Sequence, residues 1–141
     1  MLPDLVDAIS IKLNESFPSV EIYSESVLQA LNPPCFFIGV LNPSQDQLLG
    51  KRYFRKHPFD VHYFPAVADN KAEMYQKATE LTTALELVTL LNGDVIRGTE
   101  PRWEIVDGVL HFFVSYDVFV QKITTAEEFM GEVTIEADVK G

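Results

Sequence analysis

The sequence of 141 residues predicts an α+β fold, a mostly antiparallel sheet with two helices packed on one face. Candidate strands come in consecutive runs rather than alternating singly with helices, which favours an antiparallel sheet. Two segments carry apolar residues at helical spacing, near the N-terminus and in the middle of the chain. A long alternating stretch at 109–120 would span about 40 Å as a strand. Its apolar face therefore needs a helix or a second sheet laid across it.

The stretch 109–120 is the one around which we expect the fold to be organised. Side chains of a strand alternate between its two faces, so the two sets of positions can be considered separately. The even positions form an unbroken apolar row: Leu110, Phe112, Val114, Tyr116, Val118 and Val120. The odd positions are mixed and could face water or a partner: Val109, His111, Phe113, Ser115, Asp117 and Phe119.

The chain opens with a predicted helix that ends near Phe17. Pro3 and Asp4 suit a first turn, and Leu5, Val6, Ile9, Leu13 and Phe17 recur at helical spacing. A short strand is predicted at 20–23. The segment 35–41 is apolar on both faces, which predicts a central strand.

A long hairpin is predicted over 48–65, with its turn near 56–58. In its second half Phe59, Val61 and Tyr63 alternate with Asp60 and His62. A helix of about 20 residues should follow. Its capping box is Asn70 with Glu73, and Asn92-Gly93 is its expected stop. Its apolar stripe is Met74, Ala78, Leu81, Leu85 and Val88.

Strands are then predicted at 94–97 and 102–106, with a tight turn at Asp107-Gly108 leading into the long strand. We expect one domain at 1–123, followed by an acidic tail at 124–141. Alternation of Val133, Ile135, Ala137 and Val139 is typical of a strand. The tail is therefore either flexible or orders as a strand on assembly, by adding to the sheet edge of a neighbour. Its expected contact residues are Glu132, Val133, Ile135 and Glu136.

The composition excludes some classes of partner and compartment. The net charge is −10, from 21 acidic and 11 basic residues, which argues against nucleic acid or an anionic membrane as the main partner. Cys35 is the one cysteine, so no internal disulfide can form and a reducing compartment is expected. No basic and hydrophobic signal segment and no long apolar run is visible, so we expect no membrane attachment.

Catalytic, metal and cofactor sites are not predicted. The three histidines lack a cysteine or carboxylate at ligand spacing, although His62 and His111 lie on polar strand faces and could meet across a sheet. Cys35 at the start of a buried strand is expected to behave as a small hydrophobic residue. Ser, His and Asp along one strand are too far apart for a proton relay. An enzyme acting on a small ligand is therefore the least favoured function.

A basic block is the most conspicuous charge feature. Four of the 11 basic residues, Lys51, Arg52, Arg55 and Lys56, lie within six positions. This block is either a solvated hairpin tip or an electrostatic contact with another copy of an acidic chain, and head-to-tail contacts of that kind can close into rings. The predicted interface, with another subunit or with a partner protein, comprises Lys51, Arg52, Tyr53, Arg55, Lys56, His111, Ser115 and Asp117.

Several strings resemble a known family. They are PCFFI at 34–38, LNPS at 41–44, LGKRYFR at 49–55, PF at 58–59, IRGT at 96–99, EIVDGVLHFFV at 104–114 and YD at 116–117. Together they resemble the tail terminator, or tail completion, proteins of tailed phages and defective prophages of Gram-positive bacteria. The similarity covers the chain from the first helix to about Val120. These strings are structural and carry no catalytic signature.

The resemblance implies an α+β fold with helices on one side of a sheet. It also implies a homo-hexameric ring on the head-proximal end of the tail tube, which stops tube polymerisation and offers a docking surface to the head connector. The implied partners are further copies of the chain, the tail tube protein and the head–tail connector protein, with DNA passing through the lumen. The implied location is the neck of the virion tail, after assembly in the host cytoplasm. The alternative is another neck or baseplate adaptor of a phage-like particle, or a host-encoded adaptor of the same architecture.

Overall fold

The computed structural model describes residues 1–24, 31–123 and 134–138. Two helices and ten strands occur in this described part of the chain. Their order is α1 (Leu2–Ser16), β1 (Glu21–Ser24), β2 (Cys35–Val40), β3 (Ser44–Gln47), β4 (Arg52–Lys56), β5 (Pro58–Phe64), α2 (Lys71–Ala84), β6 (Leu87–Thr89), β7 (Val95–Val106), β8 (Val109–Tyr116), β9 (Val118–Ile123) and β10 (Thr134–Asp138).

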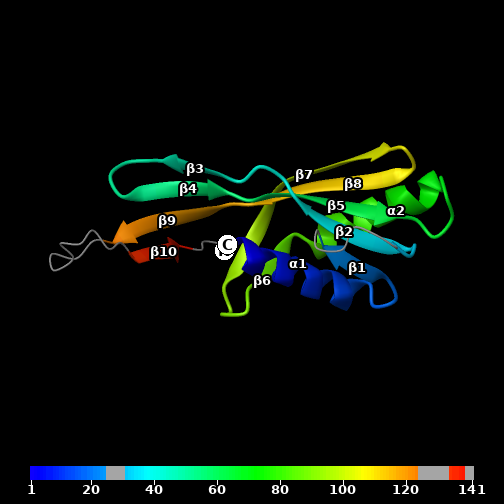
Figure 1. The fold of residues 1–141 in the computed structure, drawn as a ribbon, viewed down its shortest axis with the longest axis horizontal. Coiled ribbons are helices and arrows are strands. Elements are labelled where there is room, and N and C mark those ends of the chain that lie inside the picture. Colours follow the sequence, from blue (N-terminus) through cyan, green and yellow to red (C-terminus); the bar gives the residue numbers. More distant parts are fainter. Residues whose placement is uncertain (25–30, 124–133, 139–141) are drawn as a thin grey trace.

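The strands form two sheets. One has six strands in the order β1-β2-β5-β8-β7-β6, and the other has four in the order β10-β9-β4-β3. Strands β1 and β2 are parallel, and the other described pairs are antiparallel. The helices lie beside the six-stranded sheet, whereas the four-stranded sheet extends away from them, to the left in Figure 1. We call this four-stranded unit the projecting sheet.

The predicted fold class, one mostly antiparallel sheet with two helices on one face, is therefore wrong. The chain is richer in strand than expected, the strands are divided between two sheets, and the larger sheet curls into a half-barrel. The error arises because local alternation shows that a segment is a strand but not where its pairing partners change. Each long alternating run was assigned to one sheet, although it contributes to two.

The core lies between the helices and the curled sheet. All six even positions of 109–120 are buried, with Tyr116 and Leu110 at 0% exposure and Val114, the most exposed of them, at 4%. They form one cluster with the inward residues of the helices, which are Leu5, Ala8, Ile9 and Leu13 of α1 and Met74, Ala78 and Leu81 of α2. Cys35 is also buried, as its position predicted. Neither helix in the described part is long and apolar enough to cross a membrane.

Two strands pass without a shift of register from one sheet into the other. Arg55 pairs with Val118 in the projecting sheet, and Pro58 pairs with Ser115 in the six-stranded sheet. Two residues separate these pairs on each strand, so β4–β5 and β8–β9 form one continuous ribbon. Between these two pairs, the backbone N–H of Tyr116 donates to the carbonyl of His57 at 2.9 Å, so the pairing is not interrupted.

The predicted hairpin turn near 56–58 is wrong. The turn lies at 48–51 instead, where Leu48 N–H donates to the carbonyl of Arg52 and Gly50 adopts a φ of +64°. Pro58 resembles a turn residue in the sequence but occupies the first position of β5, where a missing N–H is tolerated. Strand β3, which pairs with β4, was not predicted because SQDQ lacks apolar alternation and is fully exposed.

The second helix ends earlier than predicted. α2 stops at Ala84, so the last two residues of the predicted apolar stripe, Leu85 and Val88, lie beyond the helix. Both are nevertheless buried, Val88 as part of strand β6. Asn92-Gly93 forms the turn between β6 and β7 rather than a helix stop. The two strands predicted at 94–97 and 102–106 are a single strand, β7, with an irregularity between Thr99 and Arg102.

The tail contributes one described strand. β10 pairs with β9 of the same chain, and Ile135 lies opposite Lys122 and Glu136 opposite Gln121. The other two predicted contact residues, Glu132 and Val133, lie outside the described residues. Whether the tail orders on assembly stays a prediction.

Candidate interaction surface and histidine cluster

The basic block lies on the projecting sheet. Lys51 belongs to the turn before β4, and Arg52, Arg55 and Lys56 follow on that strand. Because side chains alternate along a strand, Arg52 and Lys56 share one face whereas Arg55 lies on the other. The structure therefore does not gather the four cations into a single patch at a hairpin tip.

Aromatic residues lie beside the cations. Phe54 packs on Phe119 of β9 with ring centres 5.0 Å apart, and the Arg52 guanidinium lies 5.8 Å from the Phe119 ring centre. On the opposite face Arg55 donates a hydrogen bond from Nε to Gln45 of β3. Within residues 1–24 and 31–121, no carboxylate forms an ion pair with Lys51 or Lys56, and both are exposed. These two charges are therefore available to a partner.

The remaining predicted interface residues are dispersed. Tyr53 packs against the core. Ser115 donates from Oγ to Asp117, and Thr99 Oγ1 lies 3.2 Å from the same carboxylate, which anchors the junction of the two sheets to β7. His111 lies further along β8 on the six-stranded sheet. An interface role for any of these residues stays a prediction.

The projecting sheet has two edge strands, β3 and β10. All four residues of β3 are exposed. A strand paired on one side only presents backbone N–H and C=O groups that can pair with a strand of another chain. The projecting sheet thus combines an accessible polar edge with exposed cations and a partly exposed aromatic pair.

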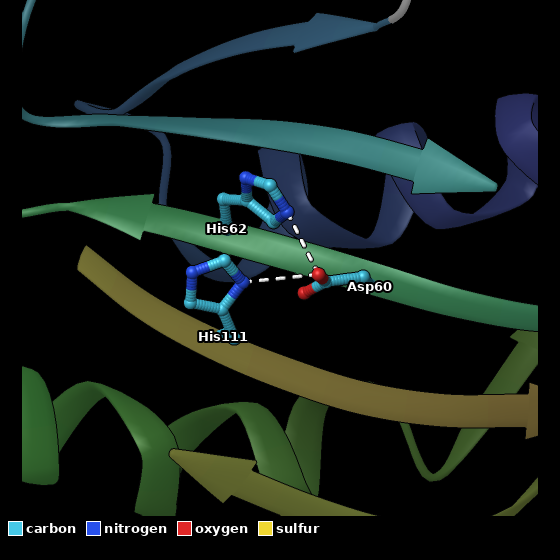
Figure 2. A group of neighbouring side chains, drawn as sticks. All are labelled: Asp60, His62 and His111. Carbon is cyan, nitrogen blue, oxygen red and sulfur yellow. Dashed lines mark hydrogen bonds and ion pairs between the residues drawn. The ribbon is translucent and has the colours of Figure 1, made fainter. Parts of the chain in front are cut away.

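A second group of side chains lies on the face of the six-stranded sheet opposite the core. His62 of β5 and His111 of β8 are direct partners across the ladder, with ring centres 4.3 Å apart. Both donate to the same oxygen of Asp60, His62 from Nε2 at 2.8 Å and His111 from Nδ1 at 3.0 Å. Figure 2 shows the two imidazoles converging on this carboxylate. The sequence leaves open whether the two histidines meet across a sheet, and the structure shows that they do.

Asp60 is the most buried member of this cluster. Its side chain is 12% exposed, against 25% for His62 and 21% for His111. Burial raises the pKa of Asp60, but the hydrogen bonds from the two histidines and the electrostatic attraction to them together outweigh burial and leave the pKa below its usual 3.8. The sequence search for ligand spacing missed Asp60, although it precedes His62 by two residues. An i, i+2 pair on a strand lies on one face, so the signal was present.

Comparison with known proteins assigns the family. A family model described as phage tail terminator protein matches residues 4–128, which is most of the chain. The chain belongs to the phage tail terminator family. The predicted family is thus confirmed, while the predicted Gram-positive origin stays a prediction. Members of this family are structural proteins of the phage tail, so this tail terminator is a virion tail component, and the family suggests no enzymatic role.

Other comparisons add little to this assignment. No curated protein matches this tail terminator. One of the solved structures that resemble it shares 10% sequence identity over 87% of this chain and 94% of the other, with a TM-score of 0.45. A similarity at this level carries no argument about function.

Proposed function

We propose that the protein assembles as a hexameric ring on the head-proximal end of the tail tube. The ring ends tube polymerisation and provides the docking surface for the head connector. The observation that carries this proposal is the family match over residues 4–128. The fold is consistent with a structural role, because its exposed features are sheet edges and charges.

The projecting sheet is the proposed contact with neighbouring subunits or with the tube. It extends away from the helices, which suits a unit that must reach a neighbour. Its exposed Lys51 and Lys56 would attract the acidic surface of another copy, since each chain carries a net charge of −10. Its edge strands offer backbone groups for pairing. A ring with this composition can also present carboxylates to its lumen, which would repel DNA phosphates and prevent adhesion during passage.

Electron microscopy of particles from a strain that lacks the gene tests the terminator role. Tails of uncontrolled length that are not attached to heads are the expected result, and restoring the gene should return normal tails. Tails of normal length would refute the proposal and favour another neck or baseplate role. An absence of tails would also refute it, because the protein would then act at an earlier assembly step.

Charge reversal tests the proposed contact. Lys51→Glu combined with Lys56→Glu should abolish ring assembly, measured by sedimentation and negative-stain microscopy. The matched control is Lys12→Glu with Lys71→Glu, which changes the net charge equally but lies on the two helices. Rings formed by the first variant as readily as by the control would show that Lys51 and Lys56 make no contact that ring assembly needs.

A further inference from the structure

The cluster of Asp60, His62 and His111 has the composition and spacing of a metal site. One oxygen of Asp60 lies 2.8 Å from His62 Nε2 and 3.0 Å from His111 Nδ1, and all three candidate ligand atoms lie within 4.8 Å of one another. Two atoms bound to one zinc ion are separated by about 3.0–3.4 Å, given bonds of about 2.0–2.1 Å. Small rotations of the side chains would therefore be enough to bind an ion between them.

The second oxygen of Asp60 is the observation that separates a metal site from a simple hydrogen-bonded triad. Oδ1 is buried and has no hydrogen-bond partner among the described residues, and Asp60 as a whole is 8% exposed. A buried carboxylate oxygen without a partner is unfavourable, because it has lost water and gained nothing in exchange. A cation held by this carboxylate would compensate for that loss.

The surroundings hold both imidazoles in place. The ring of His62 has those of Phe37 and Phe64 as neighbours, with ring centres 5.5 Å and 6.4 Å away. His111 stacks on Phe113 at 6.3 Å. The three ligands come from the paired strands β5 and β8 of the central ladder, so their backbone positions are fixed. Gly39, which pairs with Asp60 from β2, places no side chain over the carboxylate.

We propose that Asp60, His62 and His111 bind one divalent transition-metal ion, with Zn²⁺ as the representative. Two imidazole nitrogens and one carboxylate favour Zn²⁺, Co²⁺ or Ni²⁺ over Mg²⁺ or Ca²⁺, which prefer oxygen ligands. The ion takes the lone pairs of His62 Nε2 and His111 Nδ1. Each neutral ring then carries its proton on the other nitrogen, and a charged ring releases one proton. Three protein ligands leave a coordination position open on the exposed face of the sheet.

The bound ion joins the two central strands of the six-stranded sheet. It therefore stabilises the folded chain by a free energy that rises with the logarithm of the ratio of free ion concentration to Kd. All three ligands belong to one chain, so the ion can bind without ring formation. A structural consequence is that metal removal should loosen this sheet and leave the projecting sheet, which contributes no ligand, unaffected.

Calorimetric titration of the untagged, chelator-treated full chain with ZnCl₂ tests the proposal. We expect one ion per chain, with MgCl₂ giving no comparable signal. His111→Gln and Asp60→Asn should each weaken binding by about 100-fold or more, because loss of even an outer partner of a ligand costs 10–100-fold. His57→Gln is the matched control, since it removes the third histidine of the chain from outside the cluster. Unchanged affinity in His111→Gln would overturn the proposal.

A second measurement needs no variant. In the ¹⁵N-labelled wild-type chain, Zn²⁺ should shift the imidazole resonances of His62 and His111 and leave those of His57 unchanged. This result assigns the ligands even where a substituted chain fails to fold. Shifts confined to His57 or to the N-terminus, or no shift at all, would show that Asp60, His62 and His111 are only a hydrogen-bonded triad.

Discussion

The imidazole Nδ1 of His57 lies 2.8 Å from the backbone carbonyl oxygen of Tyr116, at the junction where both strands of the ribbon pass from one sheet to the other. A carbonyl oxygen can only accept, so Nδ1 carries the proton. The neighbouring backbone bond, from Tyr116 N–H to the His57 carbonyl, completes the pairing at this point. His57 therefore supports the junction with its side chain as well as its backbone.

Burial of His57 makes the stability of the fold depend on pH. Burial lowers the pKa of His57 from 6.5, and the hydrogen bond to Tyr116 offsets this only in part. Below pH 6.5 the unfolded chain therefore binds a proton that the folded chain does not, and the free energy of unfolding falls until the lower folded pKa is reached. Above pH 6.5 this contribution to stability is fully present.

Urea denaturation at pH 8 and pH 5 measures this effect in the wild type and in His57→Asn, whose amide nitrogen takes the place of Nδ1 and can still donate to Tyr116. The wild type should lose more stability on acidification than the variant. All other side chains are common to the two chains, so the difference between their losses isolates the contribution of His57. An equal loss in the two chains would contradict the buried state of His57.

Gly98 is required by a close approach between β7 and its neighbours. A Cβ atom built at this position would lie 2.7 Å from Val114 Cγ2 and 2.8 Å from the carbonyl oxygen of Leu85. We expect Gly98→Ala to lower the free energy of unfolding by about 1–3 kcal/mol, the usual cost of overpacking a core. Gly39→Ala is the comparison, because its nearest atom, the Asp60 carbonyl oxygen, would be 3.3 Å away. Thermal or urea denaturation should show a smaller loss of unfolding free energy for Gly39→Ala than for Gly98→Ala.

The cap of α2 contributes to stability through one side chain. The Asn70 side chain accepts from the backbone N–H of Glu73 at 3.1 Å, which confirms half of the predicted capping box. Glu73 instead accepts from Tyr63 and from the N–H of Ala66. Asn70→Ala should cost about 1 kcal/mol, whereas Asn70→Ser should cost little because it keeps the acceptor and brings no second negative charge to the Glu73 carboxylate, which lies 3.5 Å from Asn70 Nδ2. Chemical denaturation that gave equal values for both variants would contradict this assignment.

The aromatic pair of the projecting sheet should stabilise that unit. A double-mutant cycle of Phe54→Ala and Phe119→Ala is expected to give a coupling of about 0.5–1.5 kcal/mol, the range for paired rings. Leu49, which is 87% exposed in the neighbouring turn, provides the control substitution Leu49→Ala. The same variants should report on ring assembly, because both rings lie on the face that carries Arg52 and Lys56.

Sequence reasoning predicted those features that depend on one segment alone. The buried row of 109–120 was predicted without error because a strict period of two leaves one consistent assignment of faces. The turn at Asp107-Gly108 is confirmed, with φ values of 51° and 76° at its two residues. The first helix and the Asn70 cap are confirmed for the same reason, since their determinants lie within a few residues of one another.

Features that depend on distant segments were predicted less well. The division into two sheets depends on where each strand changes its pairing partner, which the sequence of one segment does not show. Pro58 lies close to this point, and its sequence context is that of a turn residue. Leu85 and Val88 extended the apparent stripe of α2 because burial selects apolar residues in strands and helices alike. For the histidine cluster, alternation placed Asp60, His62 and His111 on polar faces, but only the register of β5 with β8 shows that they converge.

The unbroken ribbon has a consequence for how this gene can change in length. The register of β4–β5 with β8–β9 is identical on both sides of His57. The alternation of inward and outward side chains therefore continues unchanged from one sheet into the other. Deleting Arg55 or Lys56 would turn Tyr53, Phe54 and Arg52 to the opposite side of the projecting sheet, so Tyr53 would lose its contact with the core while β5 and β8 kept their pairing. Insertions and deletions in this family should therefore accumulate in the turn at 48–51 and be excluded from the ribbon.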